Sequence, residues 1–352
     1  MVKVKIIGAG GFGGVGAVEL LTRHPEAEIV CLQDITDIGT PISALYPHLA
    51  GYCDLEIVDG EGQRAKEPVD VVFLATPDGV GMKIAPQYID AGVKVIDYSG
   101  DFRFDSQEDY AEYAGRIGRD KVHASSALLE QSVYGLTELH RDDINRDRMI
   151  VGNPGCFAVS CLLALAPAAA KRLIEPRSII CDCKTGVSGA GKKPNAAFHY
   201  PARYEMMNAY RLTGHQHVCE IERELSLLAG QSVLITFTAQ VVPVCRGIMS
   251  SVYADLKSPT KGEELVDAYR EYYTDEPFVR VLDRKAVVGS MHVRGTNRCL
   301  LVVDVDERVN RLRVISYIDN LVKGQAGSAV QNMNRLFGLE ESTGFTAPSQ
   351  YP

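Results

Sequence analysis

The sequence predicts an α/β protein: a Rossmann-type doubly wound parallel sheet joined to a second α+β domain. Short apolar runs separated by helix-length intervals fill the first part of the chain, which is typical of strands and helices that alternate around a parallel sheet. Beyond residue 153 the apolar runs lengthen and alternate more with polar residues, which favours a mixed or antiparallel sheet. The 352 residues also leave room for two domains of ordinary size.

The first domain opens with a strand, a turn and a helix. A β-branched run covers residues 2–7, a glycine-rich turn covers 8–16, and an apolar helical stretch follows at 17–21. We expect further short buried strands at 27–32, 69–75 and 93–98.

The second domain is predicted to begin with a helix. An Asn-Pro-Gly turn at 153–155 precedes the apolar, alanine-rich stretch 157–171, so a helix should start at about Cys156. The tail 319–336 has helical periodicity and ends at Gly338, a suitable helix terminator. We expect the strands of this domain at 178–184, 232–244, 250–256, 299–305 and 311–318.

The composition excludes several classes of partner. The formal charge of -8 comes from 45 acidic and 37 basic side chains without a long run of either sign, which argues against nucleic acid. The nine cysteines lack the paired spacings of a zinc site and are typical of reduced thiols. The N-terminus leads straight into a strand, and no apolar run approaches the roughly 18 residues of a membrane span. We therefore expect a cytoplasmic protein with no membrane partner and no metal.

The turn after the first strand has the spacing of a dinucleotide-binding motif. It satisfies both GxGxxG and GxxGxxG between an expected strand and an expected helix. Glycines let the backbone approach a pyrophosphate, while free amides and the dipole at the helix start favour the anion. A flexible turn that binds nothing is the alternative interpretation. The residues assigned to the cofactor here are Gly8, Gly10, Gly11, Phe12, Gly13 and Gly14.

Asp34 follows the second expected strand, 20 residues beyond Gly14 (34 minus 14). An acid at this position suits the 2′-hydroxyl of an adenosine ribose and disfavours a 2′-phosphate. A solvated loop acid would look the same in the sequence, so both interpretations stay open.

Cys156 is the candidate nucleophile. The expected helix start supplies unpaired amides and the positive end of a dipole, which stabilise a thiolate. A thiolate can attack an acyl phosphate and form a thioester, which replaces one difficult substitution by two easier steps. A single cysteine is otherwise more often a small packed side chain.

The segment from His215 to Glu220 offers a partner base. Two imidazoles, His215 and His217, and one carboxylate fall within this short stretch, and histidine suits proton transfer near neutral pH. Structural histidines or a metal site are alternatives, although no further ligand cluster favours a metal. The small-residue loop 187–193 could hold a phosphate or a nicotinamide, and Arg246 offers a cation for a carboxylate or phosphate.

Taken in order, these residues resemble the N-acetyl-gamma-glutamyl-phosphate reductase family over residues 3–340, nearly the whole chain. The cysteine motif Asn153-Pro154-Gly155-Cys156 and the paired histidines that lead to Glu220-Ile221 carry the resemblance. It also includes the segments 70–75, 95–103, 133–139, 187–191, 319–327 and 331–334.

The resemblance implies a reaction of arginine biosynthesis. Cys156 attacks the acyl phosphate, phosphate leaves, and a nicotinamide cofactor reduces the thioester to a semialdehyde. His217, with His215 as the alternative, shuttles the proton. The family generally uses NADP, and Asp34 keeps NAD possible. The resemblance assigns Ser188, Gly189 and Asn320 to the cofactor, and Asn153, Ser188, Tyr210, Glu220 and Arg246 to the substrate.

The same resemblance implies a nucleotide domain of residues 1–152 plus 319–352 and a catalytic and oligomerisation domain of residues 153–318. A homodimer or homotetramer is expected, with an acyl phosphate and phosphate as small-molecule partners. Substrate contacts could differ from the family where this chain departs from its pattern, at Phe157, Ala158, Val159, Gln216, Cys219 and Gln240.

Three other functions fit parts of the sequence. A related acyl-phosphate reductase of lysine biosynthesis would share the scaffold. Aspartate-semialdehyde dehydrogenase uses the same thioester chemistry on a shorter substrate, but the paired histidines and the 319–327 segment argue against it. A nucleotide-sensing regulatory protein would keep the glycine turn and use the thiol only for packing.

Overall fold

The computed structural model describes residues 1–349 and 351 and divides into two compact units. Unit 1 consists of Met1–Pro154 and Gln325–Ala347. Unit 2 consists of Gly155–Gly324 and the last residues from Pro348 onward. The chain thus leaves unit 1 directly before Cys156 and returns to it directly after Gly324.

Unit 1 is built on a parallel sheet of seven strands in the order β3-β2-β1-β4-β5-β7-β6. The strand order reverses between β1 and β4, which is where the carboxyl ends of strands in such a sheet leave room for a ligand. The predicted doubly wound sheet is confirmed. Its strands are β1 (Val2–Ile7), β2 (Ala27–Gln33), β3 (Ile57–Val58), β4 (Val71–Leu74), β5 (Lys94–Asp97), β6 (Ser132–Tyr134) and β7 (Ile150–Gly152).

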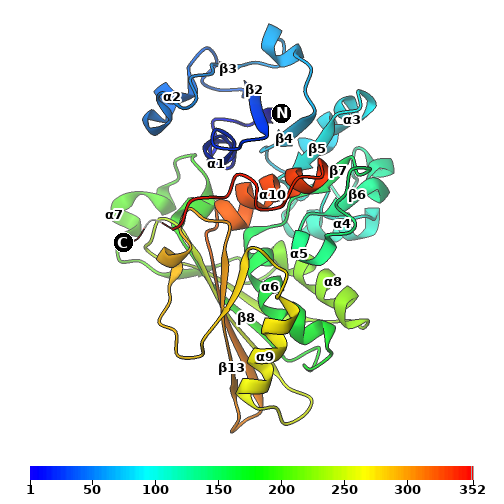
Figure 1. The fold of residues 1–352 in the computed structure, drawn as a ribbon, viewed down its shortest axis with the longest axis vertical. Helices are drawn as coiled ribbons and strands as arrows, with labels where there is room; N and C mark the ends of the chain where they lie inside the picture. The colour runs from blue at the N-terminus through cyan, green and yellow to red at the C-terminus, as the bar shows by residue number, and fades with distance from the viewer. Residues whose placement is uncertain (350, 352) are drawn as a thin grey trace. The chain divides into compact units, whose positions relative to one another are not determined.

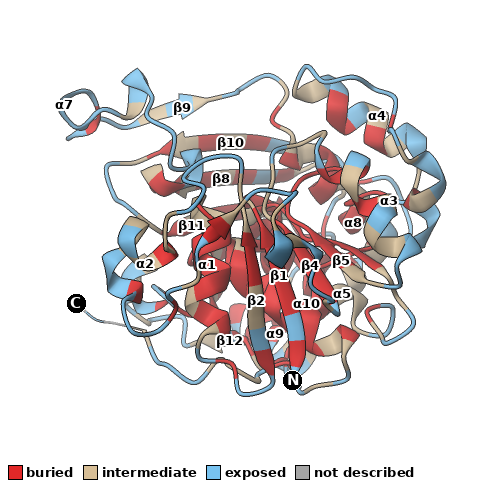
Figure 2. Cartoon of the chain, turned by 90° about the horizontal axis from the view of Figure 1, so that it is seen from above, coloured by how far each residue is buried: buried red, intermediate tan, exposed pale blue. Residues whose placement is uncertain are grey.

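The middle of this sheet is apolar and buried, although β1 and β5 also contain charged residues. All four residues of β4 are buried, as Figure 2 shows for the middle of the sheet. The C-terminal helix packs against α1, although the two lie at opposite ends of the chain (Figure 1). The helices of unit 1 are α1 (Phe12–Leu21), α2 (Ile42–Leu45), α3 (Gly81–Asp90), α4 (Gln107–Arg116), α5 (Thr137–His140) and α10 (Gly327–Leu336).

Unit 2 contains a mixed sheet of seven strands in the order β12-β13-β14-β11-β8-β10-β9. β8 pairs parallel with β10 and β12 parallel with β13, while the other pairs are antiparallel. The predicted α+β domain is therefore confirmed. Its strands are β8 (Ile179–Thr185), β9 (Asn208–Tyr210), β10 (Ile235–Val241), β11 (Ile248–Asp255), β12 (Val279–Leu282), β13 (Cys299–Asp306) and β14 (Arg311–Ile318).

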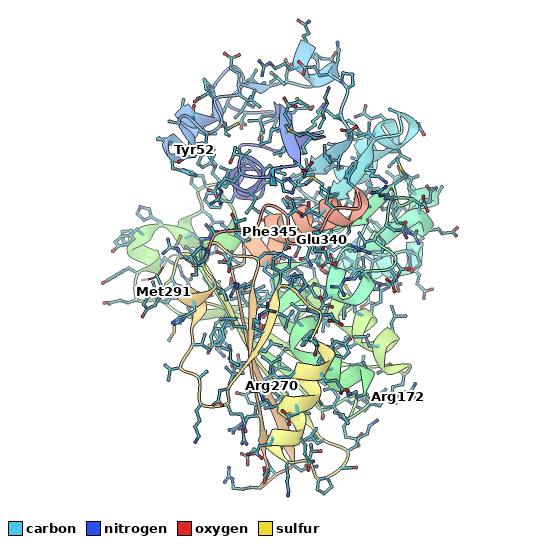
Figure 3. All side chains as sticks on the ribbon, in the orientation of Figure 1. Tyr52, Arg172, Arg270, Met291, Glu340 and Phe345 are labelled. Atoms are coloured by element: carbon cyan, nitrogen blue, oxygen red, sulfur yellow. The ribbon has the colours of Figure 1, made fainter. Side chains whose placement is uncertain are left out.

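The helices of unit 2 are α6 (Cys156–Ala170), α7 (Tyr200–Arg203), α8 (His217–Ala229) and α9 (Gly262–Tyr272). Apolar α6 is buried over nearly its whole length against the sheet, and α9 lies beside it (Figure 1). The Tyr269 hydroxyl on the buried side of α9 donates to the Ala164 carbonyl of α6 at 2.8 Å. Arg270, labelled in Figure 3, lies on the exposed side of the same helix. Within α6, Cys156 and Ala170, at its two ends, are the residues that are not fully buried.

The C-terminal tail differs from the single helix predicted over 319–336. Residues Val322–Ala326 form a π-helical turn, and α10 follows with its end near Gly338, whose φ is 69°. The side chains of Asp319 and Asn320 form hydrogen bonds ahead of the helix. The regular helix α10 is therefore shorter than predicted and begins at Gly327. Within residues 1–349 and 351, no helix has the length and apolar character needed to cross a bilayer.

Candidate functional site

The glycine-rich turn of unit 1 connects β1 to α1. Gly8 has a φ of +84°, and a Cβ there would collide with the Ala75 carbonyl, so glycine is required. Gly11 is the N-cap of α1 and has no side chain to cap the first amides of the helix. Such amides can bind an anion. The side chain of Gln325 lies against Gly13, 3.0 Å from where a Cβ would stand. This turn fits the pyrophosphate of a dinucleotide.

Asp34 lies directly after β2 and faces the same turn. Its Oδ2 accepts a hydrogen bond from the Gly10 amide at 2.9 Å, and its Oδ1 accepts one from the Ile35 amide at 2.7 Å. The residue is not simply a solvated loop acid, because its carboxylate is tied to the glycine turn.

Cys156 is the first residue of α6 and is partly exposed. Gly155 before it is the N-cap, so Cys156 lies in the first turn of the helix. The positive end of the helix dipole is there, and it favours a thiolate. Gly324 packs against it so closely that a Cβ on Gly324 would be 2.7 Å from the Cys156 Cβ. The backbone of Gly324 therefore lies directly beside the Cys156 side chain.

His217 and Glu220 pack against the residue that precedes Cys156. A Cβ on Gly155 would collide with the Nε2 edge of the His217 ring and would lie 3.0 Å from Glu220 Oε1. The Gly155 amide donates to Glu220 Oε2 at 3.0 Å, and Glu220 Oε1 is 4.0 Å from His217 Nε2. Glu220 is fully buried. One carboxylate thus contacts both the backbone before the nucleophile and the imidazole.

His215 has a different environment. Its ring packs on Phe157, Phe237 and His217, with centroid distances of 5.7, 4.8 and 4.9 Å. Burial, followed by the neighbouring charges of His217 and Arg211, lowers the pKa of His215 to about 2. Its Nδ1 accepts the His217 amide at 3.2 Å. His215 is thus a neutral hydrogen-bond acceptor at physiological pH.

Tyr210 lies at the end of β9, near this group. Its ring packs edge-on against His215 with centroids 5.7 Å apart. Burial raises the pKa of Tyr210, and the proximity of Cys156 adds to this rise. The structure thus brings together five of the predicted residues: Cys156, Tyr210, His215, His217 and Glu220.

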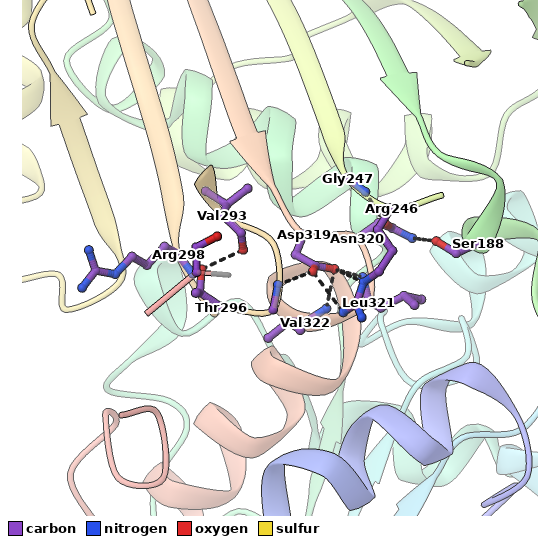
Figure 4. A network of polar contacts seen from close by, with 12 residues as sticks. Ser188, Arg246, Gly247, Val293, Thr296, Arg298, Asp319, Asn320, Leu321 and Val322 are labelled. Carbon is purple, nitrogen blue, oxygen red and sulfur yellow. Dashed lines mark hydrogen bonds and ion pairs between the residues drawn. The ribbon is translucent and has the colours of Figure 1, made fainter. Parts of the chain in front are cut away.

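A second group of predicted residues surrounds Asp319, which is fully buried (Figure 4). Arg246 forms an ion pair with Asp319, with Nη2 to Oδ2 at 3.0 Å. Asn320 donates to the Ser188 hydroxyl at 3.0 Å and accepts the Gly247 amide at 2.7 Å. The Asp319 carbonyl accepts the amide of Gly324 at 2.9 Å, which links this network to the residue beside Cys156.

Two further predicted residues have contacts of their own within their units. Gly189 is near Thr185 and Asn320, whose side-chain atoms are 3.7 and 4.0 Å from where its Cβ would stand. Asn153 belongs to unit 1, where its amide donates to the Gln325 carbonyl at 2.9 Å and its Oδ1 accepts from Asn332 at 3.3 Å. Its amide group is occupied by these structural contacts, and its assignment to the substrate stays a prediction.

Asp319, Gly324 and Gln325 contribute to these contacts but were not individually predicted as site residues. Each lies in the 319–327 segment, which contributed to the resemblance. That resemblance was the one feature of the sequence that pointed to these three residues. Their roles arise from contacts with residues more than 70 positions away, such as Arg246 with Asp319. In the part of the chain that the structure describes, no group of three or more His, Cys, Asp or Glu side chains is placed to hold a metal ion.

The domains match known families. Residues 3–146 match the semialdehyde dehydrogenase NAD binding domain, and residues 156–320 match the semialdehyde dehydrogenase dimerisation domain. The predicted nicotinamide cofactor is thereby confirmed at the level of an NAD(P)-binding domain. Among solved structures, aspartate semialdehyde dehydrogenase II of Vibrio cholerae complexed with ASA has a TM-score of 0.70 at 19% identity, over 96% of this chain and 98% of that one. At such low identity the likeness shows the fold alone.

Curated relatives are much closer in sequence. The N-acetyl-gamma-glutamyl-phosphate reductase of Pelotomaculum thermopropionicum is 44% identical over 100% of this chain and 99% of its own length. The enzyme of the same name from Bacillus cytotoxicus is 41% identical over 99% of this chain and all of its own. The resemblance found in the sequence is confirmed: this chain belongs to the N-acetyl-gamma-glutamyl-phosphate reductase family of the semialdehyde dehydrogenases.

Proposed function

We propose that this protein reduces N-acetyl-gamma-glutamyl phosphate to N-acetylglutamate 5-semialdehyde with release of phosphate, through a thioester on Cys156. The observation that carries the proposal is the arrangement around Gly155. Cys156 begins a buried helix, and the His217 ring and the Glu220 carboxylate pack against the residue directly before it. A nucleophilic thiol, a proton carrier and an orienting carboxylate therefore share one short region.

The chemistry proceeds in two halves. In the first, the Cys156 thiolate forms a bond to the acyl carbon, the bond from that carbon to the phosphate oxygen breaks, and phosphate leaves. When bound, the reduced nicotinamide supplies the hydride that converts the thioester carbonyl into a thiohemiacetal. In the second half, the bond between the sulfur and the carbon breaks, the aldehyde departs and the thiolate is restored.

His217 is the residue that moves the proton. Its Nε2 edge lies against Gly155, next to the nucleophile. It can donate a proton to the oxygen as hydride adds and take that proton back when the thiohemiacetal collapses. His215 is less suited because it accepts the His217 amide through Nδ1 and resists protonation in its buried setting. Its role is to hold the His217 backbone.

Arg246 is the proposed partner of the substrate carboxylate. Its guanidinium is partly exposed, while Asp319 behind it is fully buried and fixes its direction. A guanidinium has five donors, so an ion pair with Asp319 leaves donors for a substrate carboxylate. Ser188, through its bond to Asn320, and Tyr210 are the other pocket residues for which we propose substrate contacts.

We further propose a homo-oligomer in the cytoplasm. The match to a dimerisation domain supports self-association. Ile180 on β8 is 40% exposed. Asp182 and Lys184, which form an ion pair, follow it at alternate positions of the same strand. The nine cysteines are all free thiols, which fits a reducing compartment. Light scattering coupled to size-exclusion chromatography would distinguish a dimer or tetramer from a monomer.

The test is phosphate-dependent oxidation of N-acetylglutamate 5-semialdehyde, with aspartate semialdehyde and the one-carbon-longer aldehyde measured in parallel. Cys156→Ala should lose this turnover while still binding the dinucleotide, and Cys245→Ser, which changes an exposed thiol, should keep it. Turnover by Cys156→Ala would refute the mechanism. Faster turnover of another aldehyde would refute the proposed substrate but not the proposed thioester chemistry.

A further inference from the structure

The loop that follows β2 carries negative charge close to the glycine turn. In dinucleotide domains of this fold, an acid at the end of the second strand accepts the ribose 2′-hydroxyl of NAD, whereas a nearby arginine accommodates the 2′-phosphate of NADP. Asp34 is the first residue after β2 in this chain. Its charge and freedom of movement therefore bear on which dinucleotide is accepted.

Backbone contacts hold the Asp34 carboxylate in place. Oδ2 accepts the Gly10 amide at 2.9 Å, and Oδ1 accepts the Ile35 amide at 2.7 Å and the Thr36 amide at 3.4 Å. To swing away from an incoming phosphate, the side chain would have to leave these amides without their acceptor. A carboxylate oxygen with one hydrogen bond can still accept a second one, from a hydroxyl. The geometry therefore suits a ribose hydroxyl.

The rest of the loop provides no cation for a phosphate. Residues 33–46 contain Asp34 and Asp37 and no Lys, Arg or His. Ile35, directly after Asp34, is 91% exposed, and its aliphatic side chain offers a phosphate no hydrogen-bond donor. His48, just beyond the loop, is bonded to Glu19 at 2.8 Å.

Two basic residues of another segment lie in an element that packs beside β2. Arg64 and Lys66 lie in the short 3₁₀ helix Gln63–Lys66, which packs beside β2. Arg64 lies close enough to Cys31, inside β2, to act on it electrostatically. Lys66 is 3.8 Å from Glu61. Replacing Arg64 therefore tests whether a cation of this segment binds the 2′-phosphate of NADPH.

We propose that Asp34 makes this protein favour NAD(H) over NADP(H), a preference that rests on the proposed reductase function and narrows its cofactor. The resemblance by itself implies NADP. The residues around Asp34 fit an adenosine ribose with a free 2′-hydroxyl and do not fit a 2′-phosphate, because like charges held close together repel.

The experiment measures dissociation constants of NADH and NADPH by nucleotide fluorescence and by the shift in melting temperature, on the full chain. NADH should bind at least about tenfold more tightly than NADPH, the scale expected for one unfavourable charge contact. Asp34→Asn keeps the shape and an acceptor oxygen but removes the charge, so it should strengthen NADPH binding and narrow the ratio. Asp37→Asn removes one charge from the same loop and should leave the ratio unchanged.

Tighter binding of NADPH than NADH by the unmodified protein would overturn the preference and leave the reductase function standing. The preference would also fail if Asp34→Asn and the second variant Asp34→Ser left the ratio at the unmodified value, or if Arg64→Ala weakened NADPH binding alone. Binding of neither nucleotide would overturn both the preference and the proposed function.

Discussion

The Gly155 amide donates a hydrogen bond to Glu220 Oε2 at 3.0 Å, and the second oxygen of that carboxylate is 4.0 Å from His217 Nε2. Glu220 therefore contacts the N-cap of the nucleophile helix and the proposed proton carrier at once. These contacts are consistent with a carboxylate that orients the reacting groups, and the predicted contact between Glu220 and the substrate stays a prediction. A buried carboxyl group is tolerated in this position because a hydrogen bond from the Gly155 amide satisfies one of its oxygens.

Replacing Glu220 separates its two contacts. Glu220→Gln keeps an acceptor for the Gly155 amide but loses the charge beside His217, so kcat should fall about 100-fold, the lower end of what a positioned acid–base group contributes. When aldehyde oxidation is measured, His217 acts as the base, and the acid limb of the pH–rate profile should move towards lower pH because the imidazolium loses a nearby negative charge. Glu220→Ala loses both contacts and should cost more. Steady-state kinetics across pH would measure both effects.

Glu224→Gln is the matched control for this series, since Glu224 is another buried carboxylate on α8. It should reduce the melting temperature without moving the pH–rate profile. If both glutamine variants moved the profile equally, or if neither did, Glu220 would have only a structural role.

The elements of the fold could be predicted further than the contacts of the site. β1 and β14 have the predicted bounds, and α6 begins at the predicted residue, because apolar periodicity and the Asn-Pro-Gly turn are local signals. The place of Gly324 against Cys156 could not be predicted in this way. It arises because distant segments pack together, and no local pattern in a single sequence reports such packing.

Gly324→Ala tests that contact directly. The new Cβ would be 2.7 Å from the Cys156 Cβ, closer than carbon atoms pack, so the thiol must shift. A displacement of about 1 Å at a reacting group can cost about 100-fold, and we expect a loss of this size in kcat. Gly289→Ala, where a Cβ meets open space, should retain full activity. Equal activity of the two variants would show that the backbone accommodates the methyl group without moving the nucleophile.

His215 should make stability depend on pH. Its pKa is about 2 in the folded protein against 6.5 ordinarily, so between these values the unfolded chain binds a proton that the folded chain does not. The free energy of unfolding therefore falls as pH decreases below about 6.5. In His215→Gln this contribution is absent, and the loss between pH 7 and pH 5 should be smaller by about 2 kcal/mol. Denaturant titrations at both pH values would measure the free energy of unfolding of each protein. If this free energy fell by the same amount in His215→Gln as in the unmodified protein, the His215 ring would not be buried and neutral.

Arg246→Lys tests the proposed carboxylate site. Lysine keeps the positive charge but cannot contact Asp319 and a substrate carboxylate with a planar fork of donors. We expect KM for the acyl phosphate to rise about tenfold or more, since charge-assisted hydrogen bonds contribute about 1.5–3 kcal/mol, with a smaller change in kcat. Arg308→Lys, which alters an exposed pair with Asp306, should leave both constants unchanged. A fall in kcat at constant KM would instead place Arg246 near the reacting atoms, because only an interaction specific to the transition state changes kcat alone.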